Sequence, residues 1–236
     1  MDYNGVVKVR NVFLSVIAVA AVAVAQDTFS PLRTYVVGEK DVYSMSMKME
    51  SEQYDVTMTG KMSYLVKKLY DNGDADLETK VYNVVMNAMG QEVQQPESPA
   101  QVRRYNKYGV PIEKVDPKAP KQPTFMNFLA YRNGATLKLG ESMPIQEELN
   151  DEAKTKVKGK AKLDSISDGV AKVVTQLDIT SKNSSKPMHV ESISYLDTKS
   201  SKLNRVESKV TNVEQSATPG LPGLKSITVV LQRDKS

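Results

Sequence analysis

The sequence predicts a mainly β, antiparallel protein with at most one or two short helices. From residue 38 onward, apolar residues recur with a period of two, which is typical of strands with one buried face. Turn sequences rich in Gly, Asn and Asp separate these runs, and the 3.6-residue period of an amphipathic helix is not the dominant one. We therefore expect two related meanders that form a curved sheet, a half-barrel or a barrel.

Two alternating strands are expected at 41–50 and 54–70. Side chains two positions apart on a strand point to the same face, so the apolar residues of each strand share one face. These face residues are Tyr43, Met45, Met47, Met49, Val56, Met58, Met62 and Tyr64. Asn72-Gly73 then predicts a hairpin turn, because both residues readily adopt positive φ, and a third strand follows at 75–86.

Prolines interrupt the middle of the chain. Before them, a hairpin is expected at 102–115, turning at Gly109. The prolines at positions 117, 120 and 123 cannot donate ladder hydrogen bonds, so 117–136 is expected to be a linker. Within it, the pattern at 125–131 fits either a short helix or a further strand.

Alternating strands resume in the second half, at 155–166, 170–180, 188–196, 203–213 and 224–233. In the first of these, lysines alternate with small and apolar residues. This alternation predicts one solvated, Lys-rich face, as exposed or edge strands commonly have. The preceding polar stretch, which contains Glu147-Glu148 and Asp151-Glu152, is expected to be a solvated connection.

The two halves of the chain resemble each other. Gly60 ahead of the Asn72-Gly73 turn is echoed by Gly159 ahead of an Asp168-Gly169 turn, and each turn is followed by a β run. The preserved order of such matches predicts a degenerate duplication. Two meanders packed as one unit are expected, and the pattern does not decide between one shared sheet and two.

The N-terminus has the pattern of a secretory signal peptide. Lys8 and Arg10 precede a short apolar run that ends in Ala23-Val24-Ala25 and is followed by polar residues. The run is shorter than the roughly 20 residues that span a bilayer. We expect cleavage near Ala25 and a periplasmic or secreted mature chain without a transmembrane segment. The expected division is a signal peptide at 1–25, a first meander at 26–116, a Pro-rich linker with a short helix or strand at 117–136, and a second meander at 137–236.

Composition excludes many kinds of active site. The 236 residues include no Cys and one His, which excludes disulfides, thiolate zinc sites, iron–sulfur clusters and sites with several imidazoles. No Gly-x-Ser-x-Gly motif accompanies His189, so no catalytic residue, metal or cofactor is assigned and the protein is expected not to be an enzyme. The formal net charge of +4 is mild, and no nucleic-acid-binding motif is present, so no nucleic acid is expected as a partner.

Methionine is concentrated on the expected face of the first two strands. Met is flexible and polarizable, so this face is interpreted as an ordinary core, as the lining of a cavity for a lipid or hydrophobic ligand, or as a thioether copper(I) site to which Met188-His189 would add. Same-face residues on one strand stand roughly 6.6–6.8 Å apart, which is unfavourable for sharing one ion. The eight face residues are the candidate ligand-binding set.

The signal peptide, Gly60-Lys61, Asn72-Gly73 and the hairpin of 195–197 with 203–206 together resemble a known architecture. The chain looks like exported bacterial β-sheet proteins whose architecture is similar to that of LolA-type lipoprotein carriers, over most of 36–233. The resemblance implies a half-barrel that shelters acyl chains or another apolar ligand in its concavity. The chain departs from it in its apparent duplication and its length, and no site residue is carried over.

A curved sheet with one apolar face and few helices must curl over that face or hold something against it. The main hypothesis is therefore an exported, non-enzymatic protein that binds a lipid or other hydrophobic ligand in the concavity of its sheet. The alternative is a structural or protein-interaction module of the cell envelope with a protein partner. A thioether copper-binding protein is the third hypothesis.

Overall fold

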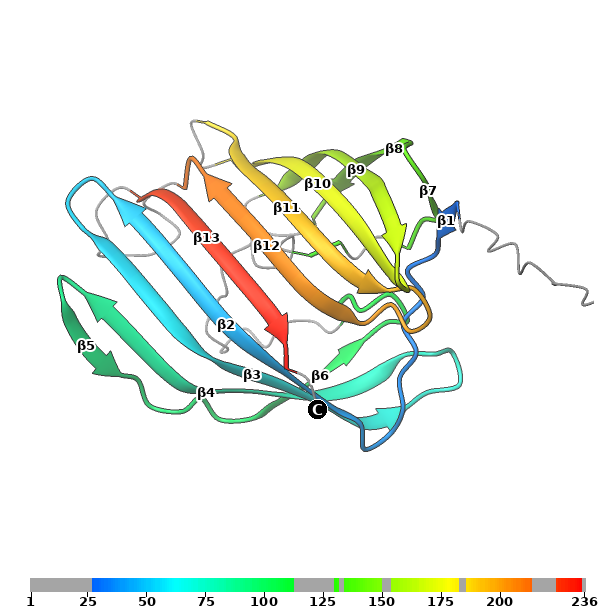
Figure 1. The fold of residues 1–236 in the computed structure, drawn as a ribbon, viewed down its shortest axis with the longest axis horizontal. Coiled ribbons are helices and arrows are strands. Elements are labelled where there is room, and N and C mark those ends of the chain that lie inside the picture. Colours follow the sequence, from blue (N-terminus) through cyan, green and yellow to red (C-terminus); the bar gives the residue numbers. More distant parts are fainter. Residues whose placement is uncertain are drawn as a thin grey trace, which may run out of the picture.

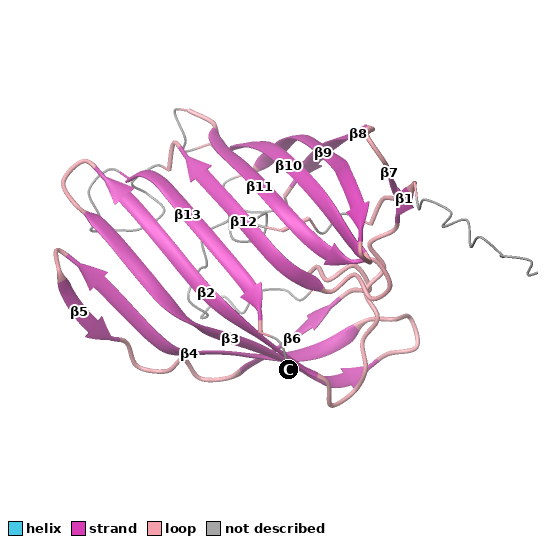
Figure 2. Cartoon of the chain, in the orientation of Figure 1, coloured by secondary structure: helices cyan, strands magenta, loops and turns pink. Residues whose placement is uncertain are grey.

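Strands make up all the regular structure of the described chain. The computed structural model describes residues 27–112, 130–131, 134–149, 154–182, 186–213 and 224–234. No helix occurs among these residues, and hence none that is long and apolar enough to cross a membrane (Figure 2). The all-β, antiparallel class is confirmed. The expected signal peptide and most of the Pro-rich segment lie outside the described residues.

The strands are β1 (Thr28–Phe29), β2 (Lys40–Ser51), β3 (Asp55–Leu69), β4 (Ala75–Ala88), β5 (Gln91–Gln94), β6 (Gln101–Tyr105), β7 (Leu137–Lys138), β8 (Ser142–Glu148), β9 (Lys156–Ser167), β10 (Val170–Thr180), β11 (Met188–Asp197), β12 (Leu203–Thr211) and β13 (Leu224–Arg233). Eleven of them form one sheet in the order β5-β4-β3-β2-β13-β12-β11-β10-β9-β8, and β6 also pairs with β4 (Figure 1). β1 pairs separately with β7.

The sheet is continuous across both halves of the chain and does not close into a barrel. The last strand, β13, lies between β2 and β12, so it joins the N-terminal strands to the C-terminal ones. The free edges are β5 with β6 at one end and β8 at the other. The ribbon curls from edge to edge (Figure 1). One open, curved sheet is thus the form that the chain adopts.

One face of this sheet is buried, and we call it the inner face; it carries Tyr43, Met47 and Val229. Its core is rich in valines that are fully shielded from solvent, namely Val157, Val173, Val190, Val206, Val210 and Val229. Of the lysines of β9 on the opposite, outer face, Lys156, Lys158 and Lys160 are exposed and Lys162 is half-buried, which confirms the predicted alternation of that strand. However, β9 is an interior strand between β8 and β10.

One stretch differs from the expectation, and a second agrees with it over its described part. The stretch with Glu147-Glu148 was expected to be a solvated connection, but it forms edge strand β8, on which Ile145 points to the core. Pro144 fits this edge position, since an edge strand need not donate every ladder hydrogen bond. The expected 102–115 hairpin is confirmed over its described part, since backbone hydrogen bonds from Asn106 N to Val110 O and from Ile112 N to Arg104 O, with the Tyr105–Pro111 bridge, pair its two arms around Gly109. Its turn is closed by Asn106 Oδ1, which accepts the backbone N–H groups of residues 108 and 110. Residues 113–115 lie outside the described chain.

Candidate functional site on the inner face

The structure brings the eight candidate residues together on the inner face of β2 and β3. Directly opposite positions on the two strands pair Tyr43 with Met62, Met47 with Met58 and Met49 with Val56. Met45 lies opposite Gly60, and Tyr64 lies beyond Met62 along β3. Tyr43, Met45, Met47 and Val56 are buried, whereas the other four are half-buried.

A row of directly opposite residues crosses the sheet at the level of Met47, and we call it the transverse row. From β4 to β8 it consists of Met86, Met58, Met47, Val229, Ser208, Ser192, Thr175, Ala161 and Met143. Cβ atoms of opposite residues lie about 4.5–5.5 Å apart. The row therefore offers three adjacent thioether side chains on β4–β2 and three adjacent hydroxyl side chains on β12–β10.

A small cavity lies at one end of the inner face, and six of its fourteen lining residues are tyrosines. Its volume is about 50 Å³, and it is lined by Arg33, Tyr35, Tyr43, Tyr64, Leu77, Tyr105, Tyr108, Gly109, Ala130, Tyr131, Leu196, Ser201, Leu203 and Leu231. The ring of Tyr64 makes edge contacts with Tyr43 and Tyr105, at centroid distances of 5.8 Å and 6.4 Å. A cavity of this size holds water-sized groups and is far smaller than the roughly 300–1,000 Å³ of a typical small-molecule site.

Arg33 supplies the positive charge at this cavity. Its Nη2 lies 3.2 Å from Asp41 Oδ2, and its guanidinium carbon lies 5.3 Å from the ring centre of Tyr35. The Nε atom is buried and has no hydrogen-bond partner among the described residues. Burial lowers the pKa of Arg33, but the neighbouring Tyr43, Tyr35 and Asp41 outweigh it and the pKa is raised. Burial raises the pKa of Tyr43, so this phenol is neutral beside a charged guanidinium.

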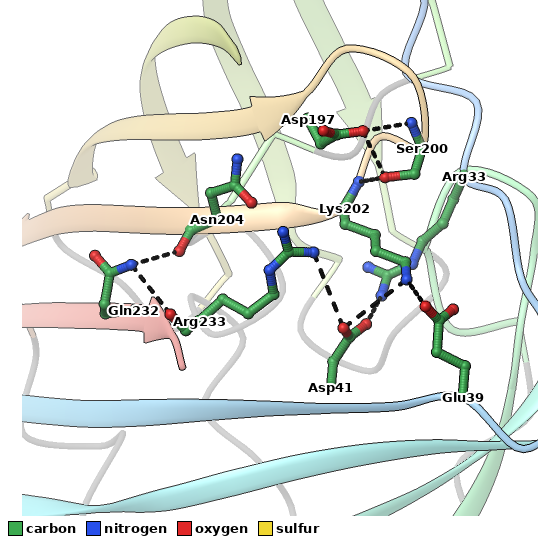
Figure 3. Close-up of polar contacts among 9 residues, drawn as sticks. All are labelled: Arg33, Glu39, Asp41, Asp197, Ser200, Lys202, Asn204, Gln232 and Arg233. Atoms are coloured by element: carbon green, nitrogen blue, oxygen red, sulfur yellow. Dashed lines mark hydrogen bonds and ion pairs between the residues drawn. The ribbon is translucent and has the colours of Figure 1, made fainter. Parts of the chain in front are cut away.

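An ion-pair cluster next to the cavity fixes the segment before β2 to the ends of β12 and β13. Its centre is Asp41, whose carboxylate lies between the side chains of Arg33, Lys202 and Arg233 (Figure 3). The Nζ atom of Lys202 also pairs with Glu39. Because Asp41 and Lys202 are only 13% and 12% exposed, the cluster is shielded from salt and acts as a structural clamp.

His189 lies on the outer face, away from the methionines. Its neighbour Val190 points to the inner face. Because successive side chains of a strand point to opposite faces, His189 points to the outer face, where its Nδ1 pairs with Asp178. The side chain is exposed and has no hydrogen bond to a serine among the described residues. His189 therefore cannot join a thioether site built on Met47 and Met58. No group of three or more His, Cys, Asp or Glu side chains in the described ranges is placed to hold a metal ion.

Sequence reasoning found part of this site and missed the rest. Of the eight candidate residues, only Tyr43 and Tyr64 line the cavity. Arg33 was missed because it precedes the first alternating strand, β2. In that segment, no alternation of apolar and polar residues indicates which way its side chain points. The one available signal was the number of tyrosines, 11 in a chain that has no Trp.

Neither a family model nor a curated protein matches this chain. Among solved structures, it is similar to one provisionally described as a lipoprotein from Parabacteroides distasonis ATCC 8503, with 11% identity and a TM-score of 0.35, over 89% of this chain and 100% of that one. Another is provisionally described as an outer membrane lipoprotein-sorting protein domain from Vibrio parahaemolyticus, with 11% identity and a TM-score of 0.23, over 83% of each chain. Their descriptions, as a lipoprotein and a lipoprotein-sorting domain, agree with the resemblance to LolA-type lipoprotein carriers that the sequence suggested. At TM-scores below 0.5 they carry no weight for the function of this chain.

Proposed function

We propose that the mature chain is an exported, non-enzymatic binding protein of the cell envelope. It holds a lipid or other hydrophobic ligand against the inner face of its open sheet, and the signal peptide is removed near Ala25. The observation that supports this proposal most is that Met47, Met58 and Met86 lie directly opposite one another on three neighbouring strands of an unclosed sheet. Such adaptable thioether surfaces suit apolar ligands of variable shape.

The size of the cavity decides where a ligand would lie. About 50 Å³ is too small for an acyl chain, so the tyrosine-lined cavity is not its site. Met58 and Met86 are half-buried and unbranched, and their side chains can repack around a chain with little strain. In this proposal the acyl chain lies along the β2–β4 part of the transverse row, bordered by the remaining candidate residues.

Displacement of a fluorescent hydrocarbon, diphenylhexatriene, from the mature chain by 1-palmitoylglycerol tests this function. Wild-type protein is expected to bind both compounds at micromolar concentration. Met58→Lys places a charge in the ligand surface and should weaken binding at least tenfold, since a buried unpaired charge is costly. The matched control is Thr57→Lys, because Thr57 is the exposed neighbour on the outer face. No binding by wild-type protein, or equal binding by both variants, would contradict the proposal.

A second candidate function, the protein-interaction module, is favoured by the β4 edge of the sheet. Val93 on β5 and Val102 on β6 are 48% and 54% exposed. Within the described residues, no strand pairs with the outer side of β5, and β6 is paired there only at its end, where Tyr105 bridges to Pro111. An exposed apolar edge strand is a template for pairing with another chain. Val93→Lys together with Val102→Lys should abolish capture of an envelope protein partner and leave lipid displacement unchanged if this second function is correct.

A further inference from the structure

Three hydroxyl groups in the middle of the inner face are buried without a hydrogen-bond partner among the described residues. Thr175, Ser192 and Ser208 are 3%, 2% and 2% exposed, and their side-chain oxygens have no hydrogen-bond partner in the described chain. They lie directly opposite one another on β10, β11 and β12. Buried polar groups in native proteins are paired with protein or with a bound molecule in the large majority of cases. Three such groups in line therefore indicate a place for a bound group.

The side chains next to the three hydroxyls along the strands are apolar except for Ser194. One neighbouring row runs through Val190 and Val210, which are fully buried, and the other through Val173, Ser194 and Val206. Val229 separates the hydroxyls from Met47. The valines offer neither donor nor acceptor to the hydroxyls, and the Oγ of Ser194 already accepts the backbone N–H of Tyr131.

Charge restricts the chemistry of the bound group. The transverse row contains no Lys, Arg or His between Met86 on β4 and Met143 on β8. A carboxylate or phosphate buried there would have no countercharge, which is strongly unfavourable. A neutral carbonyl has no such penalty and accepts hydrogen bonds from Ser and Thr hydroxyls.

We infer that Thr175, Ser192 and Ser208 bind the neutral ester or amide group of an acylated ligand. The hydrocarbon chain of that ligand lies on Met47, Met58 and Met86 in the same row. Cross-strand spacing places Thr175 about 10 Å from Ser208, which is enough for two neighbouring carbonyl groups of one ligand. This inference rests on the proposed function and specifies its ligand class.

The test compares two ligands that differ in one carbonyl group. These are 1-palmitoylglycerol, an ester, and 1-O-hexadecylglycerol, the ether without the carbonyl, each displacing diphenylhexatriene. Wild-type protein is expected to bind the ester at least tenfold more tightly than the ether. The variant with Thr175→Val, Ser192→Ala and Ser208→Ala should bind both equally, with diphenylhexatriene affinity unchanged within twofold. Each single substitution should reduce the preference by about two- to threefold, and these variants serve if the triple variant does not fold.

The control is Ser194→Ala on the same face of β11, because Ser194 already has a partner in the free protein. It should keep the ester preference. Diphenylhexatriene binding without a preference for the ester in wild-type protein, or a preference that survives in the triple variant, would overturn the inference and leave the proposed function standing. Failure of wild-type protein to bind any of the three compounds would overturn both.

Discussion

Ser192 and Ser194 point to the same face of β11 and are both buried, but only Ser194 has a partner among the described residues. Its Oγ accepts the backbone N–H of Tyr131 at 3.0 Å. This bond fixes the chain at Tyr131 against the inner face, beside the tyrosine-lined cavity. Two similar serines on one strand thus have different roles, of which one is structural.

The first prediction follows from this difference. Ser194→Ala leaves the buried N–H of Tyr131 without a partner and should lower the free energy of unfolding by about 1–3 kcal/mol. Ser192→Ala removes a hydroxyl that has no hydrogen-bond partner in the described part of the chain, so the ligand-free protein should be equally stable or slightly more stable. Urea unfolding of the two variants checks this. A larger loss for Ser192→Ala than for Ser194→Ala would contradict the assignment.

The second prediction concerns the glycine that the sequence comparison matched to Gly60. A Cβ on Gly159 would collide with the carbonyl oxygen of Gln176 and lie 2.8 Å from the Cα of Leu177, both backbone atoms of β10. Gly159→Ala should therefore destabilise the protein by at least about 2 kcal/mol. At Gly60, the nearest atom is a side-chain methyl of Val84 at 3.1 Å, which can shift.

Gly60→Ala is the matched control, with an expected change of less than about 1 kcal/mol in either direction. Thermal unfolding followed by circular dichroism measures both variants. Equal melting temperatures would show that β9 and β10 are not as closely apposed at Gly159 as described.

The third prediction tests the ion-pair cluster. Asp41→Asn leaves Arg33, Lys202 and Arg233 without their shared carboxylate. Loss of one partner of a fully buried pair costs about 3–5 kcal/mol, and the partial exposure of these side chains reduces the expected loss to roughly 2 kcal/mol. Lys48→Ala, which removes an exposed ion pair with Glu50, should change stability little. Chemical unfolding at low and high salt compares them, and an effect of Asp41→Asn that disappears in 1 M salt would contradict a shielded cluster.

The fourth prediction is a dependence of stability on pH. Burial raises the pKa of Asp76, but a hydrogen bond from Tyr70 and the pairing with Arg104 outweigh it, and the pKa is lowered. A carboxyl whose pKa is lower in the folded state stabilises the fold above its unfolded pKa of about 3.9. This contribution is lost as the pH falls from about 4 through the lower folded pKa.

Asp76→Asn should therefore reduce stability at pH 6 and show a smaller difference from wild type at pH 2. Asp71→Asn, in the exposed turn of the same hairpin, is the control and should follow wild type at both pH values. Urea midpoints measured across this range check the prediction. A difference between Asp76→Asn and wild type that is the same at pH 2 and pH 6 would contradict it.

The alternation of the sequence was sufficient to predict the strand class and the shared face of the methionines. It does not specify which residues lie opposite one another, because register depends on turns and bulges. At Asn83, with φ of 52°, β4 has an extra residue opposite Gly60, and this shifts the pairing from there on. Edge strand β8 was missed because its proline and glutamates have the composition of a loop, and only pairing with β9 makes it a strand.

The hydroxyl part of the transverse row was not predictable from the sequence of β11. That strand has Ile193 and Tyr195 on one face and Ser192 and Ser194 on the other, so composition assigns the serines to solvent. The sheet buries the serines instead, because their neighbours Val190 and Leu196 belong to the core. The packing of the whole sheet outweighs the local preference of these two serines.

Native mass spectrometry of the mature protein purified from its exporting host, followed by organic extraction, tests the central claim most directly. The account predicts a near-stoichiometric adduct that releases a neutral ester or amide with a long hydrocarbon chain. A clean mass of the free protein, together with no uptake of 1-palmitoylglycerol on incubation, would contradict the claim that this sheet carries an acylated ligand.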